Sequence, residues 1–301
     1  MAIALRSAFN RSKNLITRSA VFKNRIVQFS LQVFREMGDD DASHMAASVS
    51  YFALLSLFPL ILGVSSIVGW VADSVSRQQQ VINFVAENIP GSRDFVRESV
   101  DSLVQHRGAL GIISVAGLIW AASAVFGSIT RAVNRAWKIH KKVPFYKEKP
   151  RQIVMALALA VLFVISISIT SIFQWAGAIE IGNKSVDDMV GGSGISLILK
   201  LTVFIVTFLL FLLVYKLTPY TKTYWKDVWP GALVAALLFE VAKNLFVWYL
   251  DNFGQYNQLY GNIASVVVLM FWAYVSAYIL IIGAEVSSIF ASQRGHRDEV
   301  K

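Results

Sequence analysis

Long apolar runs alternate with short polar segments along this chain, and each run is long enough to span a membrane as a helix. The runs lie at about 45–72, 109–129, 153–177, 195–217, 230–250 and 263–290. An α-helix rises 1.5 Å per residue, so about 20 apolar residues cross a hydrocarbon layer about 30 Å thick. The pattern predicts an all-α, polytopic membrane protein, with six transmembrane helices in one membrane domain at 39–292.

A basic segment, residues 1–38, precedes the first run, and its apolar positions recur at helical spacing: Ile26, Phe29, Val33 and Met37. This spacing is typical of an amphipathic helix on a membrane surface, which we predict over 25–37. A solvated basic tail is the alternative. Gly38 interrupts the pattern. Four side chains that can cap the first spanning helix follow it: Asp39, Asp40, Asp41 and Ser43.

The polar connections differ in charge. Residues 73–107 carry mixed charge and are broken by Pro90-Gly91, which favours a pair of short amphipathic helices beside the bundle. Residues 131–151 form the most basic stretch, with eight Lys and Arg against the single acid Glu148. A short polar tail occupies 293–301.

Lysine and arginine predict the orientation. The segments 1–38, 131–151, 216–226 and 293–301 carry 7, 8, 3 and 3 of them, whereas the alternate connections carry 4, 1 and 0. Basic connections of multi-pass proteins face the cytoplasm, so we expect both termini there. The basic loops also favour anionic lipid headgroups as partners at that face, with simple topology marking as the alternative.

Composition supports a membrane protein and excludes several other classes. Hydrophobic residues make up 55% of the 301, charged residues only 16%, and the mean hydropathy of +0.55 is too high for a soluble protein of this size. The chain has no Cys, its four His are scattered, and it has no GxxxxGK[ST] loop. We therefore expect no metal centre, no cofactor, no nucleic-acid partner and no enzymatic activity, whereas an oligomer stays possible.

Ionisable residues inside the spans are the first candidates for chemistry, because a charge within a bilayer is costly and should face the bundle interior. Glu240 and Lys243 stand three residues apart on the fifth span, and Asn244 extends the same patch. The three could belong to a solute or ion pathway. They could equally form a neutralised pair that fixes helix packing.

Glu285 lies near the cytoplasmic end of the last span, and no base lies within one turn of it. Tyr274 and Tyr278 share its helix face at intervals of seven and four residues, so the three side chains could line one polar seam. The alternative is an interfacial carboxylate that pairs with Arg131 or Arg135.

The third span carries a polar stripe at intervals of four residues: Ser166, Thr170 and Gln174. Such a stripe should face protein or water, either as part of a polar pathway or as interhelical glue. In the first span, Pro59 removes an amide at mid-helix and predicts a kink there.

Five short motifs occur in order along the chain. They are 50–60 (SYFALLSLFPL), Asn134-Arg135-Ala136-Trp137, Pro230-Gly231-Ala232, 256–261 (YNQLYG) and Gly283-Ala284-Glu285. The set covers about 30–292 and resembles the YihY/BrkB family of bacterial inner-membrane proteins. The resemblance implies a six-helix protein of the bacterial cell inner membrane and suggests transport or export.

The expected function is movement of a small or amphiphilic solute, of unknown identity, across or within the membrane. A non-transporting membrane scaffold or envelope assembly factor is the alternative. The same family has also been labelled ribonuclease BN. A metal-dependent nuclease needs clustered His and carboxylate ligands and a groove for the phosphate backbone, and the scattered His residues argue against that reading.

Overall fold

The computed structural model describes residues 25–71, 110–139, 148–159, 193–253 and 262–295, together with 143–144, 146, 161–162, 180–181 and 184–185. Its long helices are α2 (Arg25–Asp39), α3 (Ala42–Val71), α6 (Leu110–Ala136), α9 (Ser193–Leu217), α10 (Trp225–Phe253) and α12 (Asn262–Gln293). Residues 148–159 are also helical. The two-residue strands β1 (Glu180–Ile181) and β2 (Lys184–Ser185) form an antiparallel pair. Apart from this small hairpin, the expected all-helical class is confirmed.

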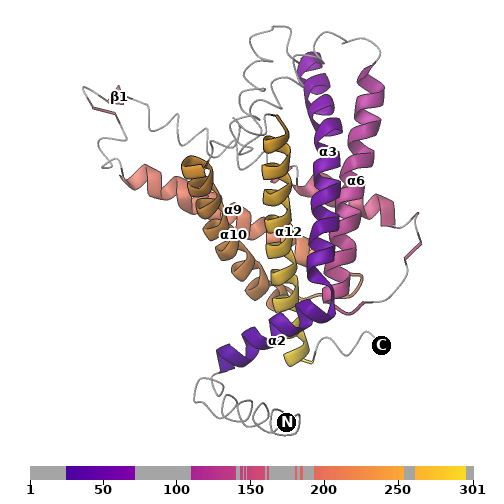
Figure 1. Cartoon of the computed structure of the whole chain (residues 1–301), viewed down its shortest axis with the longest axis vertical. Coiled ribbons are helices and arrows are strands. Elements are labelled where there is room, and N and C mark those ends of the chain that lie inside the picture. Colours follow the sequence, from indigo (N-terminus) through magenta and orange to yellow (C-terminus); the bar gives the residue numbers. More distant parts are fainter. Residues whose placement is uncertain are drawn as a thin grey trace, which may run out of the picture.

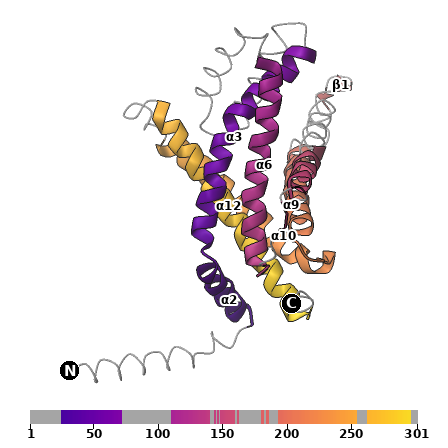
Figure 2. The same ribbon diagram turned by 90° about the vertical axis from the view of Figure 1, so that its right-hand side faces the viewer.

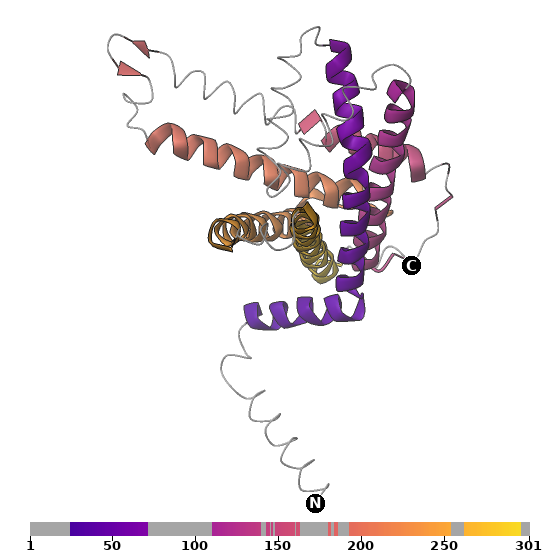
Figure 3. The same ribbon diagram turned by 45° about the horizontal axis from the view of Figure 1, so that its top comes forward.

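Helix α12 lies at the centre of the bundle (Figure 1) and packs against α3, α6, α9, α10 and α2. Helices α3 and α6 run side by side along one flank, as Figure 2 shows, while α9 and α10 form the other. Helix α2 crosses the end of the bundle beneath α12 (Figure 3). The last turns of α6 and α12 and the start of α3 therefore meet α2 at one end of the molecule.

Within the part of the chain that the structure describes, three helices are long and apolar enough to cross a bilayer: Lys200–Leu217 in α9, Trp225–Leu250 in α10 and Val266–Gln293 in α12. The outward side chains of α9 and α10 are themselves apolar, including Leu201, Ile205, Leu237, Val241 and Trp248. Large apolar side chains on an outer surface suit contact with lipid. The segment 73–107, most of the predicted third span and the loop at 254–261 lie outside the described residues.

The helix predicted at 25–37 is present as α2, which ends at Asp39, one residue after Gly38. Helix α3 is continuous through Pro59, and the kink predicted there stays a prediction. Helix α10 begins at Trp225, so Pro230 lies inside it rather than at its start. A helical amide at this position would bond to the carbonyl of Lys226. That carbonyl instead accepts a hydrogen bond from Arg294 Nη1 at 3.2 Å, which supplies the missing donor.

Helices α10 and α12 approach each other closely at two glycines. A Cβ on Gly231 would lie 2.9 Å from the Ser287 nitrogen and closer still to the Gly283 carbonyl oxygen. A Cβ on Gly283 would lie 2.7 Å from the Gly231 carbonyl oxygen and would collide with the Tyr215 hydroxyl. Tyr215 is fully buried and donates to the Leu280 carbonyl at 2.8 Å. Only glycine fits at either position, because real Cβ atoms do not approach backbone this closely.

The turn after α9 is held by side chains from two other segments. Asn134, in α6, accepts from the Tyr220 amide at 2.8 Å and donates to the carbonyls of Thr130 (2.7 Å) and Thr218 (3.4 Å). Arg151 donates to the carbonyls of Leu217 and Pro219. A buried turn without such partners would leave backbone groups unsatisfied, so the Asn134 side chain joins α6 to the end of α9.

We predict that Gly231→Ala and Gly283→Ala each destabilise the protein by about 1–3 kcal/mol, because the added methyl group forces the α10 and α12 backbones apart. Thermal unfolding of the purified protein in detergent micelles measures this as a lower melting temperature. Gly38→Ala is the matched control. A Cβ at Gly38 meets nothing within 4 Å, so alanine there should raise helix stability by up to about 1 kcal/mol. Equal melting temperatures for all three variants would contradict the close approach.

We also predict that Asn134→Ala lowers stability by about 1–3 kcal/mol, because it leaves the buried backbone groups of the turn without partners. Asn252→Ala is the control, since Asn252 is exposed and bonds only within its own helix, to the Trp248 carbonyl. The same thermal measurement separates the two. A loss no larger for Asn134→Ala than for Asn252→Ala would show that Asn134 does not hold the turn.

Candidate functional site

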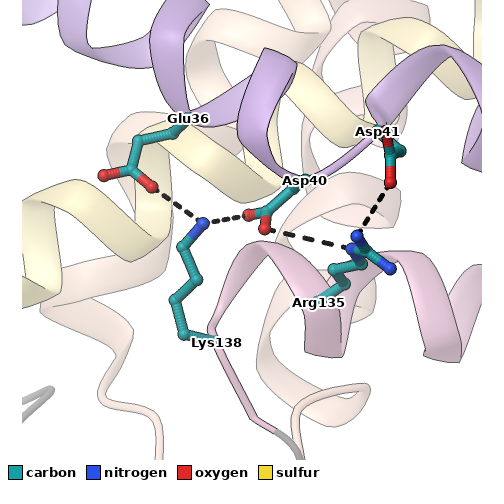
Figure 4. Close-up of polar contacts among 5 residues, drawn as sticks. All are labelled: Glu36, Asp40, Asp41, Arg135 and Lys138. Atoms are coloured by element: carbon teal, nitrogen blue, oxygen red, sulfur yellow. Dashed lines mark hydrogen bonds and ion pairs between the residues drawn. The ribbon is translucent and has the colours of Figure 1, made fainter.

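The junction between α2 and α3 brings two acids to the end of the bundle. The chain leaves α2 through hydrogen bonds from the Asp40 amide to the Glu36 carbonyl (2.9 Å) and from the Asp41 amide to the Gly38 carbonyl (3.3 Å). Asp41 has a φ of 53°, the left-handed conformation that Asp adopts more readily than most residues. This tight reversal turns Asp40 and Asp41 toward the end of α6 (Figure 4).

The end of α6 places two bases opposite these acids. The Ile139 amide bonds to the Asn134 carbonyl at 2.9 Å, and the Lys138 amide bonds to the Arg135 carbonyl at 2.8 Å. This pair of bonds is a Schellman motif, whose left-handed position is usually glycine. Lys138 occupies that position here with a φ of 54°, which costs about 1 kcal/mol relative to glycine. Glycine would avoid this backbone strain, but it would lack the Lys138 side chain.

Lys138 and Arg135 each contact two acids (Figure 4). Lys138 Nζ donates to Glu36 Oε2 at 2.8 Å and to Asp40 Oδ2 at 2.5 Å, while Arg135 Nη2 donates to Asp41 Oδ2 at 2.9 Å. Partial burial alone would lower the pKa of Lys138, but its hydrogen bonds to Asp40 and Glu36 and the charge of those acids raise that pKa overall. The Lys138 ammonium therefore stays charged at neutral pH.

A fourth carboxylate, that of Glu285, reaches this junction from α12. Its side chain lies among fully buried residues and is only 1% exposed, and Asp40 is 8% exposed. Carboxylate oxygens of Glu36, Asp40 and Glu285 lie within 4.8 Å of one another. We call these three residues the acidic cluster. Glu285 Oε1 is buried and has no hydrogen-bond partner among the described residues.

The charges of this junction do not balance. Glu36, Asp40, Asp41 and Glu285 bring four carboxylates, and Arg135 and Lys138 bring two positive charges. Two negative charges are thus in excess when all groups are ionised. A buried carboxylate needs a cation, a proton or strong hydrogen bonds to offset its lost hydration. The acidic cluster is therefore suited to take up positive charge, and its three oxygens could hold a metal ion.

The structure places the other predicted residues of α12 and α10 elsewhere. Tyr274 and Tyr278 stack on each other with ring centroids 6.0 Å apart, further along α12 from Glu285. Glu240 accepts from Lys243 Nζ at 2.7 Å, and both side chains are about one-third exposed. Asn244 donates to the Glu240 carbonyl at 2.7 Å. These contacts bring Glu240, Lys243 and Asn244 together as one patch.

The α10 patch is distant from the acidic cluster along the bundle axis. Gly231 contacts Gly283, and Glu240 lies nine residues beyond Gly231, about 13 Å further along the helix. Ser166, Thr170 and Gln174 lie outside the described residues. A shared pathway through all of these residues stays a prediction.

The sequence pattern alone did not predict that Glu36, Asp40 and Lys138 lie close to Glu285. Asp40 and Asp41 were predicted as helix caps, and their side chains form ion pairs with the bases at the end of α6. Arg135, one predicted partner of Glu285, pairs with Asp40 and Asp41 instead. The available signal was charge complementarity, since an acidic stretch at 36–41 and the basic stretch at 131–151 belong to the same predicted side of the membrane.

Comparisons with known proteins agree with this architecture. The family model described as "Virulence factor BrkB" matches residues 33–301. The chain is 29% identical to a UPF0761 membrane protein of Actinobacillus pleuropneumoniae over 81% of its length and 86% of that protein. It is 27% identical to a UPF0761 membrane protein of Pseudoalteromonas translucida (87% and 86%).

It is also 24% identical to a ribonuclease-like protein, YfkH, of Bacillus subtilis (91% and 98%). No solved structure matches the chain. The family model covers most of the chain, and the named relatives match it over most of their own lengths, so the chain belongs to the BrkB family of membrane proteins.

Proposed function

We propose that this protein spans the bacterial inner membrane six times and moves a small or amphiphilic solute across or within it, without hydrolysing a nucleotide. Three helices with the length and hydropathy of spans support the topology. Helices α3 and α6, with 30 and 27 residues, are long enough to be two more. The apolar run at 153–177 supplies the sixth.

The distribution of basic residues supports a cytoplasmic location for the end of the bundle that carries α2. The basic residues of α2, of the end of α6, of the helix at 148–159, of the turn after α9, of the start of α10 and of the residues that follow α12 include Arg35, Arg131, Arg135, Lys138, Arg151, Lys222, Lys226 and Arg294. A concentration of Lys and Arg marks the cytoplasmic side of a multi-pass protein. Both termini then lie in the cytoplasm. Arg131, Lys222 and Lys226 are exposed there, which suits contact with anionic lipid headgroups.

The observation that carries transport is Glu285 itself. It is an acid within a membrane-length helix, 1% exposed, with one oxygen lacking a partner among the described residues. Ionisable groups in such positions are costly and commonly mark the route of an ion, a proton or a solute. A group that held the bundle together would be better served by a satisfied or an apolar side chain. We infer that Glu285 exchanges a cation or a proton during the cycle.

The name of the YfkH relative does not extend to this chain in our proposal. Hydrolysis of RNA at a metal ion requires an open coordination position and a groove that admits the phosphate backbone. The acidic cluster is a poor candidate, since Asp40 and Glu285 are almost completely buried and Lys138 already bonds to Asp40. We propose that the protein is not an enzyme.

Transport can be tested in proteoliposomes with two kinds of probe. Dithionite quenching of NBD-labelled phosphatidylethanolamine and phosphatidylglycerol reports lipid movement, and a solid-supported membrane reports charge movement on exposure to a panel of solutes. We expect wild-type protein to accelerate one class of probe over empty vesicles. We expect Glu285→Gln to reduce that rate by about tenfold or more, because the amide cannot take up a cation or a proton.

Asp39→Asn is the matched control in this assay. Asp39 lies at the end of α2, is exposed, and loses the same single charge at the same end of the molecule. Its variant should keep its rate within about twofold of wild type, as for most exposed substitutions. Equal rates of probe movement in empty and protein-containing vesicles, with every probe, would contradict the transport proposal and favour the membrane scaffold. An undiminished rate in Glu285→Gln would remove Glu285 from the mechanism.

A further inference from the structure

The acidic cluster joins three parts of the chain that are distant in sequence: Glu36 in α2, Asp40 in the turn before α3, and Glu285 in α12. We propose that these three carboxylates form a binding site for a hard divalent cation that fastens α2 to the end of α12. Surface acids often gather without a ligand. This cluster has an additional feature that an ordinary acidic patch lacks.

That feature is the buried and unsatisfied oxygen of Glu285. The residue is only 1% exposed, and its Oε1 atom has no hydrogen-bond partner among the described residues. The same carboxylate lies within 4.8 Å of oxygens from Glu36 and Asp40. A buried acceptor without a donor carries the full cost of its desolvation. A cation between the three carboxylates would remove that cost.

The charge of the junction indicates the charge of the ligand. With Asp41, Arg135 and Lys138 included, the ionised junction carries two excess negative charges. One divalent cation neutralises it. A monovalent cation would leave a net negative charge in a largely buried place, where charge interactions are stronger than in water.

The donor set indicates the class of ion. All three ligands are carboxylate oxygens, which favour Ca²⁺, Mg²⁺ and Mn²⁺ over softer metals that bind thiolate or imidazole. Three oxygens within 4.8 Å of one another can share a centre at about 2.8 Å, slightly longer than the usual Ca²⁺–oxygen distance of about 2.3–2.6 Å. A small inward movement of the side chains would complete the site for Ca²⁺. A larger one would suit Mn²⁺ or Mg²⁺.

Lys138 allows the proposal to predict the direction of a change in cation affinity. Its ammonium already contacts Glu36 at 2.8 Å and Asp40 at 2.5 Å, so it and a metal ion compete for the same two carboxylates. Removal of this ammonium should therefore tighten cation binding. A simple network of structural ion pairs predicts no cation affinity in either form. The effect of Lys138 thus separates a cation site from a salt bridge.

The test is a titration of purified, full-length protein in detergent micelles with Mn²⁺, followed by the electron paramagnetic resonance signal of the free ion. We expect one saturable site per chain, displaced by Ca²⁺ or Mg²⁺. Glu285→Gln and Asp40→Asn should weaken binding by about tenfold or more, since each removes one charged ligand. Asp39→Asn removes a neighbouring exposed charge and should leave the affinity within about twofold of wild type.

Two substitutions at Lys138 complete the test. Lys138→Met should bind Mn²⁺ about fivefold more tightly or better, and Lys138→Arg should stay close to wild type, because arginine keeps the competing charge. If Lys138→Met is poorly stable, Mn²⁺ should raise its melting temperature more than an equal ionic strength of NaCl does.

If no Mn²⁺ binding is detected at concentrations up to about 1 mM, the site is overturned. A dissociation constant above that value is weaker than that of even low-affinity protein cation sites. Unchanged binding in Glu285→Gln would place the ion elsewhere and overturn it as well, as would Lys138→Met that binds no more tightly than wild type. The inference concerns the same acids as the proposed transport but needs no gradient. A protein that binds Mn²⁺ here yet moves no probe would retain the site and lose the transport proposal. The reverse result would retain transport alone.

Discussion

The burial of one carboxylate among apolar helices constrains the whole end of this bundle. Glu285 has buried neighbours on both sides along α12, because Ala284, Val286 and Ser287 are each at most 5% exposed. An acid in such a place must be offset locally, since ionised groups lose most of their hydration there. Lys138, just after α6, does not offset Glu285 directly, because it bonds to Asp40 and Glu36. The position of α2 therefore depends on how the charges of the junction are offset.

The close approach of α10 to α12 buries the face of α12 opposite Glu285. Gly231 and Gly283 let the two backbones touch, and Glu285 follows Gly283 by only two residues. Ser287, one turn beyond Gly283, donates to the Gly283 carbonyl at 2.9 Å, so its polar group turns inward. Small residues thus bring α10 and α12 together. Glu285 lies two residues from Gly283, about 200° around the helix, where its carboxylate is near those of Glu36 and Asp40. Close packing and the acidic cluster therefore occupy opposite faces of α12 at this end.

The helical class was accessible from the sequence because apolar runs of membrane length have few alternative structures. The amphipathic helix at 25–37 was predicted from the spacing of Val33 and Met37, and both are buried in the structure. The acidic cluster was not accessible in the same way. Its members lie on three elements, and helical periodicity relates residues only within one element. The tertiary crossing of α2 beneath α12 created the site.

The start of α10 shows a second limit of local reasoning. Proline usually opens a helix or interrupts it, which led to a predicted start at Pro230. The helix begins at Trp225 because the carbonyl that Pro230 leaves unpaired is satisfied by Arg294, from the far end of α12. A distant side chain thus replaces the local donor that the pattern requires. Both this helix start and the missed cluster depend on contacts between residues that are far apart in the sequence.

Backbone strain at the junction bears on whether its charges are structural or functional. Among the described residues, Asp41 and Lys138 are the two non-glycine residues with positive φ, and both belong to this junction. Each conformation costs about 1 kcal/mol that glycine would avoid. The ion pairs that these two residues make are partly exposed, as in Arg135–Asp41 and Lys138–Glu36, and such pairs contribute little net stability. A strained junction with two excess negative charges is a poor means of holding helices together. It is better suited to holding positive charge between them. This single requirement accounts for the acids, the strained lysine and the unsatisfied Glu285 oxygen.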